Sequence, residues 1–438
     1  MSKGRIFGDV APRRPKMWQV GSALAVLALV GAACGSSSPT AKKSSGTTTT
    51  TSSGGSTTTS STPGGSTTTT SAGGASTGSG SGSSGGSNSG GGSSGSSCGN
   101  VVSASCDTQV QSASITGAGS TFDQPLFARA FYTYNQQTGG KVNVSYAAVG
   151  SGTGISDIQS QTVDFGATDV PLSPPSGNGG AILEIPVALG GVAMAYNLPG
   201  VSGQLKFTAQ NLVDIYMGRI TQWNDGKLTA NNPQLSGVNQ AIVTVHRADS
   251  SGTSYIFTDY LNHVDSTWSS TGPGVSKSPA WTKGASGSLG GNGNPGVAAD
   301  VANTQYSIGY VELAYALQGN IAYGQVQNQA GSFVTPSLSS VSAAASQFPN
   351  VSYQNFSIVN APGAGSYPIA GYSWGLVYQN QSNQAKGIAL GKLLDWESST
   401  GQSAASSIGY APLPANIQAL AHNTILQMMY GGKPLFNG

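Results

Sequence analysis

Charged side chains are scarce in this sequence of 438 residues: 8% of the positions are charged, divided into 18 basic and 16 acidic residues. Five of the basic residues and one of the acidic residues fall within residues 1–33, which leaves 13 basic against 15 acidic residues in the rest. The remaining chain is slightly acidic and contains no basic run. Nucleic-acid binding needs a basic face to meet the phosphate backbone, so we expect no nucleic-acid partner.

Histidine is also scarce, and His246, His263 and His422 are far apart in the sequence with no cluster of carboxylates beside them. A catalytic metal needs several such ligands together. We therefore expect no metal, no other cofactor and no metal-dependent phosphatase activity.

Only three cysteines are present. Cys34 belongs to the N-terminal signal described below, which leaves Cys98 and Cys106 as an isolated pair at the start of the folded region. A zinc site would need further Cys or His ligands nearby, and there are none. We predict a disulfide between Cys98 and Cys106, which an exported protein can form.

Long apolar runs are missing except for residues 23–30, which are too few to span a bilayer as a permanent helix. This run follows a basic segment ending at Lys16 and precedes Gly31-Ala32-Ala33-Cys34. The pattern predicts a bacterial export signal over residues 1–33 and a lipid-acceptor site, such as for palmitate, at Cys34. Gly31 stands where lipoprotein signals prefer an aliphatic residue, so cleavage without a lipid remains the alternative.

Residues 35–97 consist almost wholly of Gly, Ser and Thr. Such a composition buries too little apolar surface to offset the entropy of ordering. We expect residues 34–97 to be a lipid-anchored tether with a root-mean-square span of roughly 45 Å, which holds the folded part outside the cell membrane.

The region from about residue 106 to the C-terminus is long enough for two α/β domains. Helical spacing occurs at residues 126–134, 256–261 and 416–430. Strand-length apolar runs occur at residues 142–149, 163–170, 182–187, 192–197, 242–246 and 369–378. Strands that alternate with helices predict α/β domains with largely parallel sheets, in which ligands bind beyond the carboxyl ends of strands.

Three loops rich in Gly, Ser and Thr, at residues 117–122, 150–154 and 247–254, precede predicted helices. A helix N-terminus offers unpaired N–H groups and partial positive charge to an anion, and Arg247 adds a forked, charge-assisted donor. Ser, Thr and Asp also cap helices without binding anything, and capping alone is an equal alternative for any one loop. Three such loops in one chain favour a shared oxyanion site.

At these residues the chain resembles the phosphate-binding proteins of bacterial ABC-type phosphate importers. The resemblance covers residues 114–438. It is closest at residues 116–122 (TGAGSTF), 163–173 (VDFGATDVPLS) and 247–254 (RADSSGTS), with weaker matches at 190–192 and 308–312.

The resemblance implies an α/β, two-lobed periplasmic-binding-protein-like fold with a hinge and a ligand cleft between the lobes. Lobe I would comprise residues 106–188 and 365–438, and lobe II residues 189–364. The implied role is an extracellular solute-binding protein, not an enzyme, that acts as a monomer. It would capture inorganic phosphate and deliver it to the membrane permease and ATPase subunits of a transporter.

The resemblance also implies the binding residues. Arg247 would pair with the anion and be held by Asp249, and Asp169 would accept a hydrogen bond from the proton that phosphate keeps near neutral pH. Without the resemblance, Asp169 is more simply interpreted as a solvated turn residue. The remaining implied donors are Thr121, Phe122, Ser151, Ser251, Gly252 and Thr253. Ser250 departs from some relatives, which have Gly there.

Three other functions remain as alternatives. A binder of another tetrahedral oxyanion is the nearest, and Asp169 distinguishes it from a phosphate binder. A serine hydrolase would use Ser251 with His246 or His263, but the Gly-x-Ser-x-Gly pattern of a nucleophile elbow is missing around Ser251. A wall-anchored adhesin would explain the tether but not the three loops.

Overall fold

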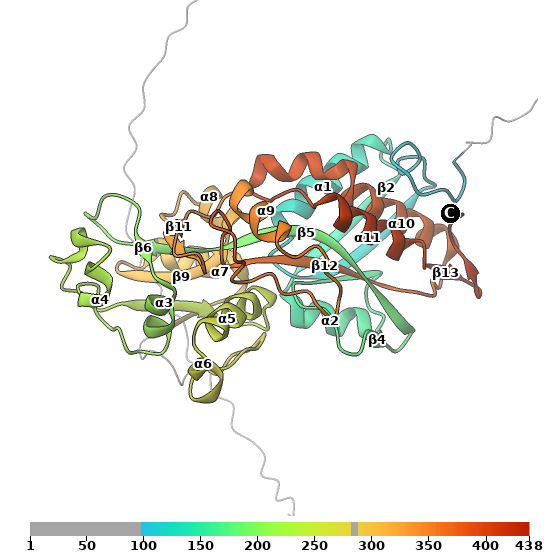
Figure 1. Ribbon diagram of the computed structural model, residues 1–438. Coiled ribbons are helices and arrows are strands. Elements are labelled where there is room, and N and C mark those ends of the chain that lie inside the picture. The colour runs from blue at the N-terminus through green and yellow to red at the C-terminus, as the bar shows by residue number, and fades with distance from the viewer. Residues whose placement is uncertain (1–97, 282–287, 438) are drawn as a thin grey trace, which may run out of the picture. The chain divides into compact units, whose positions relative to one another are not determined.

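The computed structural model describes residues 98–281 and 288–437. Their central element is a mixed β-sheet of nine strands flanked by helices (Figure 1). In the order in which they lie side by side, its main strands are β2 (Val142–Ala148), β1 (Ala113–Gly119), β3 (Phe165–Thr168), β12 (Ala370–Tyr378), β5 (Gly180–Asn197), β9 (Ser307–Glu312), β7 (Val243–Arg247) and β8 (Leu289–Gly291). The short strand β4 (Ser176–Gly177) pairs with β5 beside this row. The predicted export signal, Cys34 and the tether at residues 34–97 lie outside the described residues.

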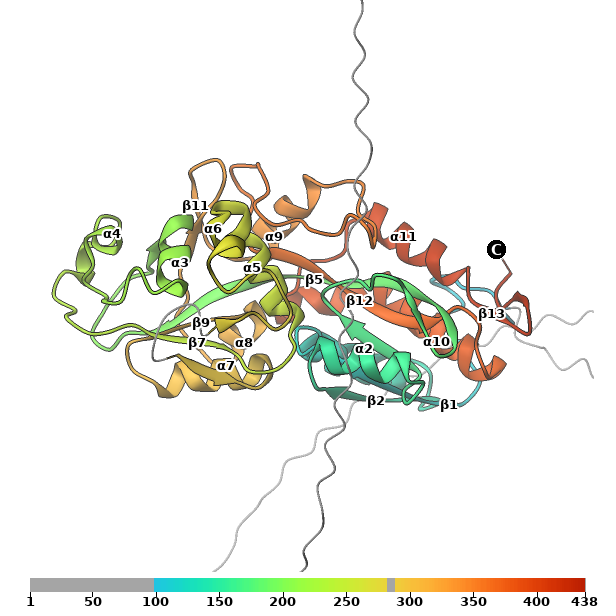
Figure 2. The same ribbon diagram turned by 90° about the horizontal axis from the view of Figure 1, so that it is seen from below.

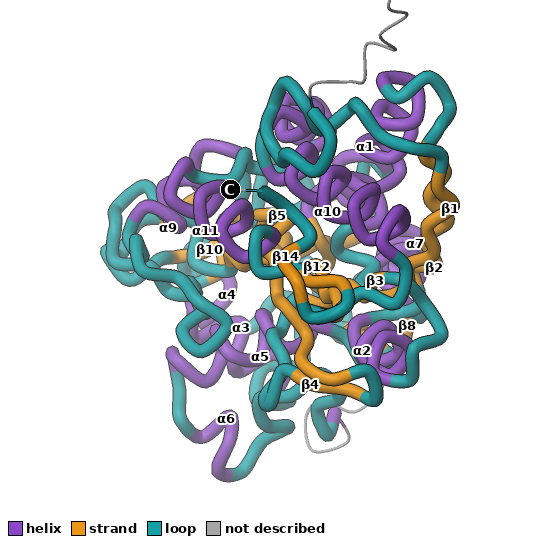
Figure 3. Tube along the Cα trace, turned by 90° about the vertical axis from the view of Figure 1, so that its right-hand side faces the viewer, coloured by secondary structure: helices purple, strands orange, loops and turns teal. Residues whose placement is uncertain are grey.

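One half of the sheet, β2–β1–β3, is covered on both faces. Helices α1 (Gln124–Gln137) and α10 (Gln384–Ser398) lie over one face, and α2 (Ser151–Gln159) lies over the other (Figures 1 and 3). The elements that complete this half are α11 (Ala415–Ile425), the 3-10 helix η3 (Thr400–Ile408) and the hairpin β13 (Met429–Tyr430) and β14 (Lys433–Pro434). The core between α1 and the sheet includes the packed aromatic rings of Phe127, Phe131 and Phe165.

The other half, β9–β7–β8, has its own helices. Helix α7 (Gly293–Asn303) packs on these strands, and α5 (Gly252–Val264) lies on the opposite side (Figure 2). The surrounding elements are α3 (Ala209–Tyr216), α4 (Gly226–Thr229), η1 (Pro233–Leu235), α6 (Thr267–Ser270), α8 (Leu313–Gln318), α9 (Leu338–Ser346) and a small sheet of β11 (Phe333–Val334), β10 (Gln325–Gln327) and β6 (Lys206–Phe207).

Strand β5 joins the two halves. Its residues 182–191 pair with β12, and its residues 192–197 pair with β9. Because each half carries its own helices on a shared sheet, the chain has the expected two-lobed α/β architecture. Within the described residues, no helix combines the length and apolar character that a membrane span requires.

Two expectations about the sheet were wrong. The apolar runs at 182–187 and 192–197 form one strand, because Gly190 and Gly191 provide close approach rather than a turn: a Cβ on Gly190 would lie 2.6 Å from the Phe122 ring. The sheet is also not largely parallel. The pairs at both ends are parallel, but β12 runs antiparallel to β3 and β5, and β5 runs antiparallel to β9.

The helix predicted at 416–430 is confirmed in position but ends at Ile425. Met429 and Tyr430 instead pair with the following strand, and Gly431 and Gly432 adopt positive φ angles between them. Glycine accommodates such angles without a steric penalty, so the tight hairpin replaces the last helical turn.

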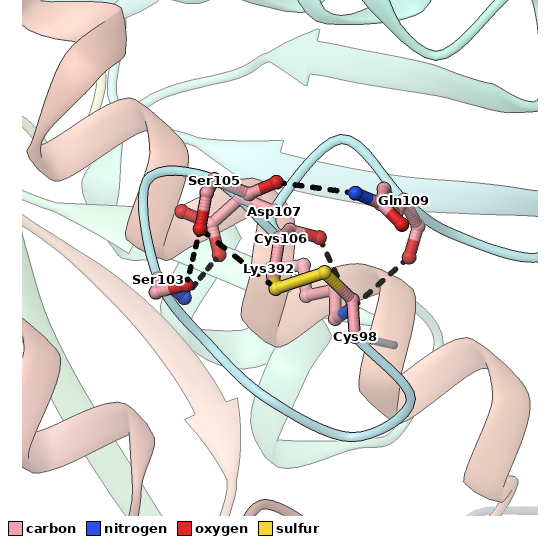
Figure 4. The surroundings of a disulfide bond; sticks show 7 residues. All are labelled: Cys98, Ser103, Ser105, Cys106, Asp107, Gln109 and Lys392. Carbon is pink, nitrogen blue, oxygen red and sulfur yellow. Dashed lines mark hydrogen bonds between the residues drawn. A yellow bond between two sulfur atoms is a disulfide. The ribbon is translucent and has the colours of Figure 1, made fainter. Parts of the chain in front are cut away.

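The predicted disulfide between Cys98 and Cys106 is confirmed (Figure 4). The buried Lys392 of α10 donates hydrogen bonds from Nζ to the carbonyl oxygens of Cys106 (3.1 Å) and Gln109 (3.0 Å). The disulfide loop is therefore fixed to the body of the fold by a charged group that is satisfied by backbone carbonyls.

Candidate functional site

Four helices begin close together where the two halves of the sheet meet. Each follows the carboxyl end of a strand: α1 follows β1, α2 follows β2, α5 follows β7 and α7 follows β8. Their first turns supply N–H groups with no partner inside the helix, and their dipoles place partial positive charge at these ends. All three loops singled out in the sequence lie at these helix starts.

Asn294, at the start of α7, links the first loop to the third. Its side-chain amide donates to the hydroxyl of Thr121 (3.0 Å) and to that of Thr253 (3.1 Å), and its backbone N–H also donates to Thr121 (3.0 Å). Arg247 Nη1 in turn donates to Thr253 (3.4 Å). Thr121, Thr253 and Arg247 are thus connected although more than 120 residues separate Thr121 from the other two.

Ser151 links the second loop to the third. Its hydroxyl oxygen accepts hydrogen bonds from the backbone N–H of Gly252 (3.1 Å) and, at 3.5 Å, from that of Asp169. A Cβ on Gly252 would lie 2.5 Å from both Cβ and Oδ2 of Asp169. Glycine is therefore required at 252, because only the bare backbone fits against the carboxyl group.

Arg247 and Asp249 form a forked ion pair at the end of β7. Arg247 Nε donates to Asp249 Oδ1 (2.7 Å) and Nη2 donates to Oδ2, while the N–H of Gly293 also donates to Oδ1 (3.0 Å). Burial alone would raise the pKa of Asp249, but the hydrogen bonds and charge of Arg247 hold it below its usual value. The Arg247 side chain is 1% exposed, so its charge acts in surroundings that water screens poorly.

Asp169 lies on the opposite side of the site, directly after β3. Its Oδ1 accepts a hydrogen bond from the hydroxyl of Ser373 (2.7 Å), whereas its Oδ2 has no hydrogen-bond partner within the part of the chain that the structure describes. Burial raises the pKa of Asp169 to about 6, although the hydroxyls of Ser120 and Ser373 and the charge of Arg247 favour its ionised form. Asp169 is therefore buried, not the solvated turn residue of the simpler interpretation.

Three tyrosines fix the backbone of the first loop. The hydroxyls of Tyr146 and Tyr315 donate to the carbonyl oxygens of Ser120 (2.7 Å) and Thr121 (2.6 Å), and Tyr410 donates to the carbonyl of Phe122 (2.5 Å). Because the carbonyl groups are held, the orientation of the intervening peptide planes is set as well. Tyr315 is on α8, so this loop is held from both halves of the sheet.

Two of the predicted donors already make hydrogen bonds within the protein. The hydroxyl oxygen of Ser251 accepts from the N–H of Ser254 (3.0 Å) and caps α5, which leaves its proton available. The N–H of Phe122 donates to the Ser120 hydroxyl oxygen (2.9 Å). The structure thus brings every predicted residue to one site, but capping and local bonds account for part of the hydrogen-bonding capacity of Ser251 and Phe122.

Asn294 and Ser373 were not predicted from the sequence. Asn294 belongs to a glycine-rich stretch after β8, and a fourth loop of this composition was the signal that could have identified it. Ser373 is a small hydroxyl side chain in the buried strand β12, among aromatic and aliphatic residues, and a buried hydroxyl in such a strand indicates a hydrogen-bond partner elsewhere in the fold.

The contacts of the histidines bear on the hydrolase alternative. The His246 ring stacks on Trp281, with centroids 5.0 Å apart, and its Nδ1 lies 2.9 Å from the carbonyl oxygen of Arg247. His263 pairs with Asp259 one turn earlier in α5. Neither ring is among the hydrogen-bond partners found for Ser251. Among the described residues, no group of three His, Cys, Asp or Glu side chains could hold a metal ion.

Comparisons with known proteins agree on one group. A model of the PBP superfamily domain matches residues 36–397. The chain is similar to the phosphate-binding protein PstS of Haemophilus influenzae, with 39% identity over 310 residues that cover 70% of this chain and 91% of that protein. The PstS of Xylella fastidiosa strain 9a5c is 38% identical over 322 residues, which cover 73% and 86%.

A solved structure shares the fold. It is a high-affinity periplasmic phosphate-binding protein, PfluDING, bound with phosphate, and it superposes with a TM-score of 0.55 at 20% identity, covering 74% of this chain and all of that one. At this identity the likeness concerns the architecture, which matches the two-lobed arrangement described above.

Proposed function

Because the chain belongs to the PBP superfamily and, within it, to the family of the phosphate-binding proteins PstS, we propose that it captures inorganic phosphate between its lobes and delivers it to an ABC importer. Capture uses hydrogen bonds alone, and no bond of the ligand is broken. The partners are the permease and ATPase subunits of the transporter, and the protein works as a monomer.

The observation that carries this proposal is the contrast between one acceptor and many donors in the same buried site. Among the described residues Asp169 Oδ2 has no hydrogen-bond partner and can accept a hydrogen bond, and Arg247, whose charge acts on Asp169, is the charged donor of the site. Phosphate near neutral pH keeps a proton for the acceptor and has oxygens for the donors, whereas sulfate has no proton and meets a buried carboxylate instead. The other donors in the proposal are Thr121, Phe122, Ser151, Ser251, Gly252 and Thr253.

The donors make tight binding plausible without a basic patch. Charge-assisted hydrogen bonds are worth roughly 1.5 to 3 kcal/mol each, and a site shielded from water preserves them. Asp249 holds the guanidinium of Arg247 in a fixed orientation, so less entropy is lost when the ligand binds.

The location and the domain limits complete the proposal. Export by residues 1–33, lipidation at Cys34 and a tether over 34–97 place the folded part at the outer face of the cell membrane. Lobe I comprises residues 106–188 and 365–438 and lobe II residues 189–364. The crossing of β5 from β12 to β9 near residue 191 supports the first of these limits to within a few residues.

Calorimetric titration of the full chain with phosphate, arsenate and sulfate tests the function. Phosphate and arsenate are expected to bind with similar affinity, because they share shape and protonation, and sulfate is expected to bind at least 100-fold more weakly. Equal binding of sulfate would favour a general oxyanion binder. Steady release of product from a phosphate ester would contradict a purely binding role.

A further inference from the structure

The hydroxyl of Ser373 lies between two buried carboxyl groups. Its oxygen is 2.7 Å from Oδ1 of Asp169 and 2.7 Å from Oδ2 of Asp123, and all three side chains are at most 1% exposed. A break in strand register between Ser373 and Trp374 accompanies this placement, and such bulges redirect a side chain.

Two short contacts at one hydroxyl require a count of protons. A serine hydroxyl carries one proton and can donate once, whereas an ionised carboxylate can only accept. If both acids were ionised, the serine proton could serve only one of the two contacts. In the other contact, a lone pair of the serine oxygen would face a negatively charged carboxylate oxygen. Both contacts are hydrogen bonds only if one of the acids is protonated and donates to the serine oxygen.

We infer that Asp123 and Asp169 share one proton through Ser373, that Asp123 carries it, and that Asp123 is therefore a specificity-determining residue of the site. The order of donation is Asp123 Oδ2–H to Ser373 Oγ, then Ser373 Oγ–H to Asp169 Oδ1. This leaves Asp169 ionised, with Oδ2 restricted to accepting. The role in specificity rests on the proposed capture of phosphate, but the position of the proton does not.

The surroundings favour the proton on Asp123. Burial raises the pKa of Asp123 well above its usual value, and the nearby acids raise it further. Asp169, by contrast, has the charge of Arg247 to stabilise its ionised form. The titratable groups whose charges act on Asp123 or on Asp169 are Asp123 and Asp169 themselves, Glu312, Glu397, Arg247, Tyr146, Tyr315 and Tyr410.

The position of Asp123 in α1 supports a role other than capping. Asp123 is the N-cap residue of this helix, yet its side chain makes no capping hydrogen bond and turns to Ser373 instead. Its Oδ1 has no partner among the described residues. An unpaired carbonyl oxygen of a neutral acid costs far less than an unpaired buried carboxylate oxygen, which agrees with a protonated Asp123. Asp169 Oδ2 is also unpaired among the described residues, but the charge of Arg247 stabilises the ionised form of Asp169 and does not act in this way on Asp123.

The location of the proton decides what the site accepts. A protonated Asp169 would become a donor and would satisfy a fully ionised oxyanion such as sulfate. With the proton held on Asp123, Asp169 can pair only with a ligand that brings its own proton. Asp123 thus keeps the discriminating acceptor ionised without touching the ligand.

Infrared spectroscopy of the ligand-free full chain at pH 7 tests the proton directly. The wild-type protein should show carbonyl absorption from protonated carboxylic acids, and D123N should lose one component of it, whereas D169N should lose none. The matched control is D164N, which alters an acid that forms an ion pair with Lys386 and should leave the band unchanged. Loss of a component in D169N but not in D123N would overturn the assignment.

Binding measurements test the effect on specificity. Ser373→Ala removes the donor that keeps Asp169 ionised, so the preference for phosphate over sulfate should fall about tenfold at pH 7. The pH at which half of this preference is lost should also rise. Ser373→Thr keeps the hydroxyl and should restore the wild-type preference and its wild-type pH dependence. A wild-type pH profile in Ser373→Ala would refute the role of the bridge. Failure of the unchanged chain to bind phosphate would refute the proposed function and leave the infrared result standing.

Discussion

The two sides of the site handle buried carboxyl groups in different ways. Asp249 is neutralised by the guanidinium of Arg247, through a forked pair that also orients the cation. Among the described residues no cation is hydrogen-bonded to Asp169, which is linked through Ser373 to another acid, Asp123. A carboxylate that pairs with a cation holds that cation in position to attract an anion. A carboxylate that is linked to another acid by a shared proton can accept a hydrogen bond from a protonated anion and repels an anion without a proton. Affinity and specificity should therefore respond separately to mutation.

The largest expected effect on affinity is on the cationic side. Arg247→Ala removes the charged donor of the site, so phosphate affinity should fall about 100-fold, because charge-assisted hydrogen bonds are worth roughly 1.5 to 3 kcal/mol each. Isothermal titration calorimetry measures the loss. The matched control is Arg219→Ala, which breaks the more exposed pairs with Asp214 and Asp265 and should leave affinity unchanged. Equal affinities in the two variants would place the ligand elsewhere.

On the acidic side, Asp169→Asn should change specificity more than affinity. The amide can donate to an oxyanion as well as accept, so rejection of sulfate should weaken about 10- to 100-fold while phosphate affinity falls about tenfold. Competition between the two anions measures the ratio. If sulfate stayed excluded while phosphate binding was lost, Asp169 would be a structural residue rather than the discriminating acceptor.

A pH series separates the two sides without mutation. The pKa of Asp169 is raised to about 6, so the group is ionised at pH 8 and takes up a proton as the pH falls through 6. Rejection of sulfate should therefore be strongest at pH 7 to 8 and should decline several-fold by pH 5. Asp249 has a lowered pKa and keeps its charge over this range, so the cationic side stays constant. In Asp169→Asn, the rejection of sulfate should no longer depend on pH. If the variant kept the pH dependence of the wild type, another group would be responsible for the titration.

The smallest expected effect on binding is at the disulfide. Replacing Cys98 and Cys106 together by Ser removes a short cross-link whose cysteines are not among the predicted ligand contacts. The free energy of unfolding should fall by about 2 kcal/mol, since loops of this size gain little more from closure. Phosphate affinity should stay within a factor of two. A larger loss of phosphate affinity in calorimetry would show that the disulfide loop, which Lys392 holds in place, affects the binding site.

The positions of the loops were predicted from the sequence better than the sheet was. Thr121, Ser151 and Arg247 were identifiable because each lies where a strand gives way to a helix start, which is a local pattern. Asp169 follows β3, which leads to β4 rather than to a helix, so only the family resemblance identified it. The direction of β12 and the continuity of β5 were not identifiable. An apolar run has the same appearance whether its neighbour is parallel or antiparallel, and Gly190-Gly191 has the appearance of a turn until Phe122 is seen packed against it.

By itself the sequence determined the α/β class, the loops that lie at helix starts and the cysteines that pair, because propensity, patterning and the chemistry of helix starts act over a few residues. Tertiary structure alone decided that Asn294 bridges two loops and that Ser373 lies between Asp123 and Asp169. Those contacts join residues more than 40 and as many as 250 positions apart, and their geometry is set by the packing of whole strands and helices rather than by any local preference.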